Sequence, residues 1–182
     1  MRLPGFDLVR SRIDDSEQAN LLRDSSLRFV RGGRLSPDEK QIAIVEHVND
    51  VGIYLLPAEG GEAKLLLRGR CDRPDWSPDG NTLVFEDISK GAFLLSVIDV
   101  RTRKVAVVPE STGLSFPRWS PDGRYLAAVR DNDQAIMLFD FEKQQWSKAA
   151  DGKSWFPTWS PDGIYLYFIS VQGTANTGIS EQ

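Results

Sequence analysis

A five-residue motif, Trp-Ser-Pro-Asp-Gly, occurs three times in this 182-residue chain, at residues 76–80, 119–123 and 159–163. A degraded fourth copy, Leu-Ser-Pro-Asp-Glu, occupies residues 35–39. Successive copies are about 40 residues apart, which is the length of a four-stranded blade in a β-propeller. The chain is therefore expected to be a repeat protein in which each copy marks the same place in one blade.

The motif has the residues of a tight turn between two strands. Proline at the second position presets φ, the aspartate can accept hydrogen bonds from nearby backbone N–H groups, and glycine tolerates a positive φ. The tryptophans are expected to pack on the neighbouring blade rather than to stack on a ligand. The residues assigned to this structural turn motif are Ser36, Pro37, Asp38, Trp76, Ser77, Pro78, Asp79, Gly80, Trp119, Ser120, Pro121, Asp122, Gly123, Trp159, Ser160, Pro161, Asp162 and Gly163.

The segments after each turn predict strands that are covered on both faces. Near-continuous apolar runs at 83–85, 126–129 and 166–169 are typical of such strands. A second hairpin follows in each repeat, for example 94–99 with 104–108. We therefore expect an all-β fold, a β-propeller of four-stranded antiparallel blades.

The expected domain organisation is a single propeller domain over residues 1–182 with about four blade-equivalents. Its predicted parts are an N-terminal half blade at 6–30, blades at 31–70, 71–111 and 112–152, a C-terminal half blade at 153–171 and a polar tail at 172–182. The two half blades are complementary, so one blade is expected to be split between the chain ends. Three arrangements stay open: a four-bladed ring, a homodimer that closes an eight-bladed ring, or a piece of a longer protein.

Trp-Ser-Pro-Asp-Gly followed by a Leu-x-Phe type strand resembles the TolB-like, WD-like propeller repeat, over four copies and most of the chain. The first copy departs from that pattern at Leu35 and Glu39. The resemblance implies a bacterial binding protein of the periplasm. The N-terminal residues contain no apolar stretch of the kind found in secretory signals, so the chain as written is expected in the cytoplasm.

Acidic residues recur in the predicted loops between the second and third strands of the blades. Such loops gather on one rim of a propeller, where they could receive a basic peptide or a calcium ion, since calcium takes oxygen ligands. Ordinary solvated loops are the alternative. No other cofactor and no metal ligand set is expected. The candidate binding residues are Glu46, His47, Asp50, Glu86, Asp87, Asp131 and Asp133.

Several chemistries find no support in the sequence. A net charge of −4 without a basic cluster argues against nucleic acid, and no apolar run is long enough for a membrane span. Cys71 is the only cysteine and His47 the only histidine. Residues 113–117, Gly-Leu-Ser-Phe-Pro, lack the final glycine of a nucleophile elbow. The chain is therefore expected not to be an enzyme.

The function predicted from these features is a scaffold that binds a protein or peptide partner through rim loops and the central channel. One alternative is a substrate-gating propeller of a larger serine hydrolase resembling the prolyl oligopeptidases. A second alternative is a propeller that binds a sugar or a cation.

Overall fold

The computed structural model describes residues 6–14, 16–22, 27, 29–48, 51–89 and 91–171, and the regular structure in these residues is entirely β-strand. None of the described residues forms a helix that could span a membrane. The strands are β1 (Val9–Ser11), β2 (Gln18–Asn20), β3 (Val30–Leu35), β4 (Gln41–Glu46), β5 (Gly52–Pro57), β6 (Lys64–Arg68), β7 (Cys71–Trp76), β8 (Thr82–Asp87), β9 (Leu94–Asp99), β10 (Val105–Val107), β11 (Leu114–Trp119), β12 (Tyr125–Arg130), β13 (Ile136–Asp140), β14 (Gln145–Ala150), β15 (Ser154–Trp159) and β16 (Leu166–Ser170).

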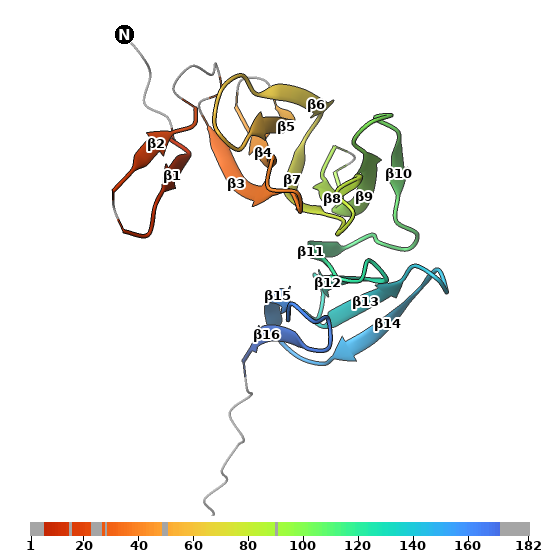
Figure 1. Cartoon of the computed structure of the whole chain (residues 1–182). Coiled ribbons are helices and arrows are strands. Elements are labelled where there is room, and N and C mark those ends of the chain that lie inside the picture. The colour runs from red at the N-terminus through yellow and green to blue at the C-terminus, as the bar shows by residue number, and fades with distance from the viewer. Residues whose placement is uncertain are drawn as a thin grey trace, which may run out of the picture.

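These strands form three four-stranded blades, β3–β6, β7–β10 and β11–β14, and two hairpins, β1–β2 and β15–β16. Each of these pairings is antiparallel and joins strands that are consecutive in the sequence. The blades follow one another along an arc, and the first strands, β3, β7, β11 and β15, lie on its concave side (Figure 1). The predicted all-β propeller architecture is confirmed.

The core lies between neighbouring blades. The apolar runs that follow the turns form the second strands, where Ile44, Val84 and Ala128 are fully buried. One core cluster joins Ala43 and Val45 of β4 to residues of the next blade, including Phe85. Strands covered on both faces explain why these segments are apolar at nearly every position rather than at alternate ones.

The Ser-Pro-Asp-Gly turns repeat one hydrogen-bond pattern. In the second copy, Ser77 Oγ donates to Asp79 Oδ1 at 2.5 Å, and the N–H of Asn81 donates to the same oxygen at 3.0 Å. The N–H of Thr82 donates to Ser77 Oγ at 2.9 Å. The hydroxyl and the backbone N–H stabilise the ionised carboxylate and lower the pKa of Asp79. The turn thus fixes the register of each blade's first hairpin.

Glycine in the motif also serves the contact between blades. Gly80, Gly123 and Gly163 all have φ between 71° and 76°. A Cβ on Gly123 would lie 3.2 Å from Cγ of Pro78, the proline of the preceding turn, and Gly80 and Gly163 face Pro37 and Pro121 in the same way. Each turn therefore packs against the previous one, and a Cβ would be crowded at Gly123, whereas at Gly80 and Gly163 it would make ordinary contacts at 3.7 and 3.6 Å.

The first copy of the motif differs from the other three at the glycine and at the tryptophan position. Glu39 has a φ of 60°, as the glycines do, but no earlier copy of the motif precedes it in the sequence. Leu35 takes the place of tryptophan, and its side chain is exposed. The two departures therefore both fall in the first of the described four-stranded blades.

The motif tryptophans tie neighbouring first strands together, with one exception. Trp76 Nε1 donates to the carbonyl of Arg34 at 2.8 Å, and Trp159 Nε1 donates to the carbonyl of Arg118 at 3.1 Å. Trp119 instead donates to Gly123 of its own turn at 3.1 Å and stacks on Phe141. Two of the three indoles therefore bond to the preceding blade.

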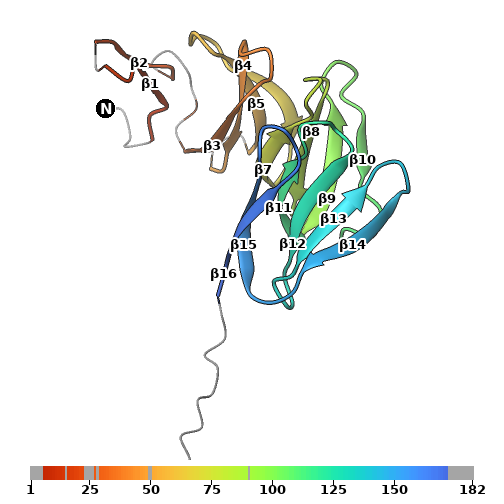
Figure 2. The same cartoon turned by 60° about the horizontal axis from the view of Figure 1, so that its bottom comes forward.

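The end hairpins have the two-stranded form expected of half blades, but they belong to separate sheets. They lie at opposite ends of the arc in both views (Figures 1 and 2). The two hairpins are thus not paired with each other within this single chain.

Candidate functional site

The concave wall carries the same irregularity in every blade. The register of each first strand with its neighbour shifts at one bulge, between Arg31 and Arg34 in β3, and at the equivalent place in β7, β11 and β15. One residue inside each bulge has a left-handed backbone conformation. These residues are Gly32 (φ 60°), Arg73 (φ 47°), Phe116 (φ 55°) and Phe156 (φ 55°).

Three of these four residues are not glycine, which makes the position unusual. A left-handed conformation costs an L-residue about 1–2 kcal/mol. Bulges commonly re-aim a side chain, and strained backbone is often found at functional sites. The side chain of Phe156 is 58% exposed, so it regains little of this cost by burial.

Arg73, Phe116 and Phe156 form a continuous row across two blades and the β15–β16 hairpin. The Arg73 guanidinium carbon lies 4.2 Å from the centroid of the Phe116 ring. The rings of Phe116 and Phe156 meet edge to face, with centroids 5.2 Å apart. We call these three residues the wall row. It offers a cation and two aromatic faces along the concave side.

The Glu86 carboxylate accepts hydrogen bonds from two residues of the wall row. The N–H of Phe116 donates to Glu86 Oε1 at 2.7 Å, and Arg73 Nη1 donates to Oε2 at 2.7 Å. Burial raises the pKa of Glu86, and these two donors counteract the rise. Glu86 was expected in a rim loop, but it belongs to β8 and is fully buried.

A second set of charges lies beside the row on the same strands. Arg34 Nε lies 3.4 Å from Asp75 Oδ1, and the N–H of Trp119 donates to Asp75 Oδ2 at 2.9 Å. Burial raises the pKa of Asp75. Burial, and then the positive charge of Arg34, lowers the pKa of Arg118. The wall thus places three arginines, Arg34, Arg73 and Arg118, on consecutive blades.

The other rim candidates of the first blade differ in their contacts. Glu46 is fully buried in β4 and accepts hydrogen bonds from the N–H groups of Phe29 and Val48, both at 3.0 Å. His47 Nε2 lies 3.7 Å from Asp72 Oδ1. Asp50 lies outside the described residues.

The remaining acids cap local turns. Asp87 accepts the N–H of Ser89, and Asp131 accepts the Ser115 hydroxyl at 2.7 Å. Asp133 pairs with Arg130, whose hydrogen bonds lower the pKa of the Asp133 carboxyl to about 2. In the described part of the chain, no three His, Cys, Asp or Glu side chains form a group that could hold a metal ion. Calcium binding at this rim stays a prediction.

Cys71 is buried where β7 begins, and it is a free thiol. Burial raises the pKa of this thiol to about 12, and the negative charge of Asp87 adds to the rise. A protonated, enclosed sulfur is a poor nucleophile. Cys71 therefore acts as a small core residue.

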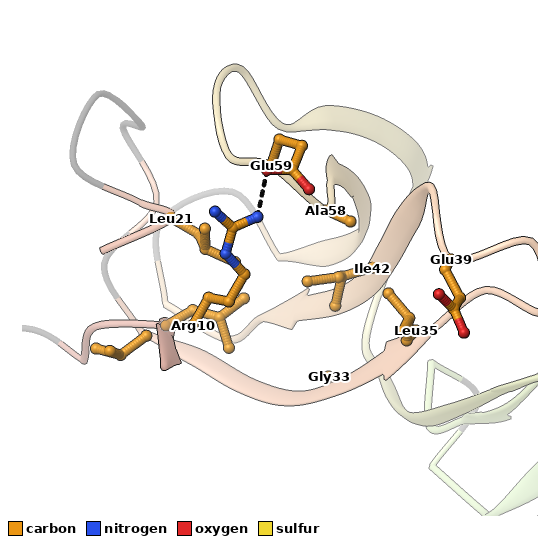
Figure 3. Close-up of a pocket in the computed structure, with 10 residues that line it drawn as sticks. Arg10, Leu21, Gly33, Leu35, Glu39, Ile42, Ala58 and Glu59 are labelled. Carbon is orange, nitrogen blue, oxygen red and sulfur yellow. Dashed lines mark hydrogen bonds and ion pairs between the residues drawn. The ribbon is translucent and has the colours of Figure 1, made fainter. Parts of the chain in front are cut away.

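A pocket of about 440 Å³ lies between the β1–β2 hairpin and the β3–β6 blade. Its floor is mainly apolar, formed by Leu8, Leu21, Leu35 and Ile42, and an ion pair between Arg10 and Glu59 crosses its mouth (Figure 3). It lies beside the first strand of the first blade, where Leu35 replaces tryptophan.

Comparison with known proteins supports the fold found here. No protein-family model matches the sequence. A TolB protein from Agrobacterium tumefaciens is 26% identical, with a TM-score of 0.72 over 79% of this chain and 55% of its own. TolB from Acinetobacter baumannii is 21% identical, with a TM-score of 0.80 over 93% of this chain and 44% of its own. The chain thus spans about half the length of these structures.

One curated relative is described as a peptidase. The uncharacterized peptidase YuxL of Bacillus subtilis is 28% identical over 103 residues, which are 54% of this chain and 15% of that protein. The Trp-Ser-Pro-Asp-Gly turns, the blade topology and the structural neighbours agree. The chain is built from TolB-like β-propeller repeats.

Proposed function

We propose that the chain is a non-enzymatic scaffold that binds a peptide, or an extended segment of a partner protein, on its concave wall. The observation that carries this proposal is the wall row: Arg73, Phe116 and Phe156 hold left-handed backbone conformations at one repeat position, with Phe156 exposed and with Arg73 and Phe116 half-buried. Arginine and aromatic side chains dominate the energetics of protein interfaces. A strained conformation that displays them favours binding over folding as the reason for their presence.

The wall also fits an extended ligand better than the rim does. The row runs across the neighbouring first strands β7, β11 and β15, so one peptide could contact all three. The rim acids, by contrast, already accept hydrogen bonds from neighbouring residues of the chain. A basic partner would have to compete with those bonds.

Selection from a random peptide library displayed on phage, with the purified chain as bait, tests the proposal. Peptides enriched on the wild type should bind the Phe156→Ala variant at least about 10-fold more weakly, as expected for an interface anchor. Phe93→Ala is the matched control, because Phe93 is also an exposed phenylalanine but lies in the loop before β9 and outside the wall row. Equal loss in both variants, or loss only with Phe93→Ala, would move the site from the wall to the rim.

A second candidate is the propeller part of a larger peptidase. The similarity to the B. subtilis peptidase favours it, because the matched stretch is only 15% of that protein. Reading the gene on both sides of this sequence tests it. A hydrolase segment with serine, aspartate and histidine in hydrolase order would support the candidate, and stop codons directly flanking the propeller would eliminate it.

A further inference from the structure

The inference drawn here rests on the proposed peptide-binding role of the wall and names the chemistry of its ligand. We propose that Arg118 is the centre of a carboxylate-binding site, and that the wall selects a peptide whose carboxylate lies beside an aromatic or aliphatic side chain. The site is formed by β3, β7 and β11, with Arg34 and Asp75 flanking Arg118.

The three wall arginines differ in their partners. Arg73 pairs with Glu86 at 2.7 Å and lies 3.6 Å from Asp72. Arg34 pairs with Asp75 at 3.4 Å. Arg118 donates from Nη1 to the carbonyl of its neighbour Pro117 at 2.7 Å, and it forms no ion pair within the part of the chain that the structure describes. One guanidinium on the wall is therefore available to an incoming anion.

The environment of Arg118 makes its charged guanidinium group unfavourable when no anion is bound. Its side chain is partly buried, and both Arg34 and Arg73 repel its charge. Asp75 attracts it, but the oxygens of Asp75 already face Arg34 and the N–H of Trp119. A partly buried cation without a close counter-ion has lost part of its hydration, which is unfavourable. An anion bound here would compensate Arg118 for that loss.

A carboxylate fits this site better than other anions of a peptide. The planar guanidinium presents paired N–H donors that match the two oxygens of a carboxylate. Phe116 lies two residues from Arg118 on β11, and its ring meets that of Phe156. The ligand should therefore carry an apolar side chain close to the carboxylate. A free C-terminus and an Asp or Glu side chain both meet this description.

Titration of the intact chain with N-acetylphenylalanine and with its amide, followed by NMR, tests the charge requirement. The acid should bind at least about 10-fold more tightly than the amide, in line with a charge-assisted hydrogen bond. A tripeptide amide with glutamate next to phenylalanine then separates the two carboxylate sources. Binding by this peptide as tight as that of the acid indicates side-chain recognition, and weaker binding indicates recognition of the C-terminus.

Two variants should move the affinity in opposite directions. Arg118→Gln should reduce binding of the acid to the level of the amide. Asp75→Asn keeps the size and shape of the side chain but removes the competing negative charge, so it should tighten binding of the acid about 3-fold or more. Arg101→Gln, at an exposed turn on the outer side of a blade, is the control and should change nothing.

The outcomes separate this inference from the proposed function. Equal affinity for the acid and the amide would overturn the carboxylate site while leaving the wall as a peptide site. Binding of neither probe, nor of any library peptide, would overturn both. If Arg118→Gln does not fold, Asp75→Asn decides: unchanged or weaker binding of the acid contradicts the site.

Discussion

The glycine of each turn has no Cβ, and a Cβ at this position would lie against the proline of the preceding turn. A Cβ added to Gly123 would crowd Pro78 of the preceding turn. Gly113 has a similar φ, 74°, but a Cβ added there would meet open space, with nothing within 4 Å among the described residues beyond its own chain neighbours. The two positions therefore share the conformational requirement and differ in the contact between blades.

Alanine substitution at both glycines separates these effects. Gly113→Ala should lower the free energy of unfolding by about 1–2 kcal/mol, the cost of a left-handed L-residue. Gly123→Ala should lower it by roughly 1 kcal/mol more, because its methyl group would crowd Pro78. Urea unfolding measures both, and equal losses would contradict the proposed packing of turn on turn.

Some residue conformations could be predicted from the sequence and others could not. Turn residues such as Pro78 and Gly80 were predictable because their conformational preferences are local. The left-handed backbone at Phe116 was not, since only Gly32 among the four equivalent residues suggests a positive φ. Aligning the four copies on their prolines would have shown the position, but not its exposure or its strain.

Within single elements, the turn carboxylates link stability to pH. Ser120 Oγ and the N–H of Arg124 donate to Asp122, and these bonds lower its pKa below the ordinary value of 3.8. A carboxyl whose pKa is lower in the folded state stabilises the fold above pH 3.8. That contribution is lost as the pH falls through the lowered value.

The Asp122→Asn variant should therefore be less stable than the wild type at pH 7, and the gap should shrink as the pH falls below about 4. Removing a charge-assisted hydrogen bond predicts a gap of about 1 kcal/mol at neutral pH. Thermal unfolding between about pH 2 and pH 7 provides the comparison, because this range includes the pH values below about 4 at which the carboxyl takes up its proton. A gap that stays constant with pH would show that the charge of Asp122 contributes nothing.

Strand positions could be predicted where the local sequence pattern determines them. The prediction failed at Glu86, where a distant segment of the chain determines burial. The apolar runs at 83–85 and 126–129 correctly predicted buried second strands, whereas burial was wrongly predicted for the run at 166–169, which forms the largely exposed β16. Glu86 directly follows one of these runs, and its charge suggested a loop. It is buried because the bulge of β11, about 30 residues later in the chain, brings the N–H of Phe116 to its carboxylate. Such a long-range contact leaves no signal near Glu86.

For the whole molecule, the two end hairpins present unpaired edges. Among the strands that the structure describes, β16 pairs only with β15, and β1 pairs only with β2. Tyr167 and Ile169 of β16 are 58% and 61% exposed, whereas the equivalent second strands are buried in the other blades. An exposed apolar strand with a free edge favours association, and the β1–β2 hairpin of a second copy would complete the four-strand order of a blade.

We therefore expect light scattering to give twice the 20.4 kDa mass of one chain. Ile169→Lys should restore the mass of one chain, because a charge on this edge strand opposes pairing. A single-chain mass for the wild type at all concentrations would contradict the dimer, and would leave the concave wall to be formed by one chain.

The claim that the first strands β7, β11 and β15 form one binding wall is tested most directly by hydrogen–deuterium exchange, with and without a peptide from the library selection. We expect slower exchange along β7, β11 and β15 together when the peptide binds, because the wall row spans these strands. Protection confined to the rim loops at 87–93 and 130–135, with the first strands unchanged, would contradict it.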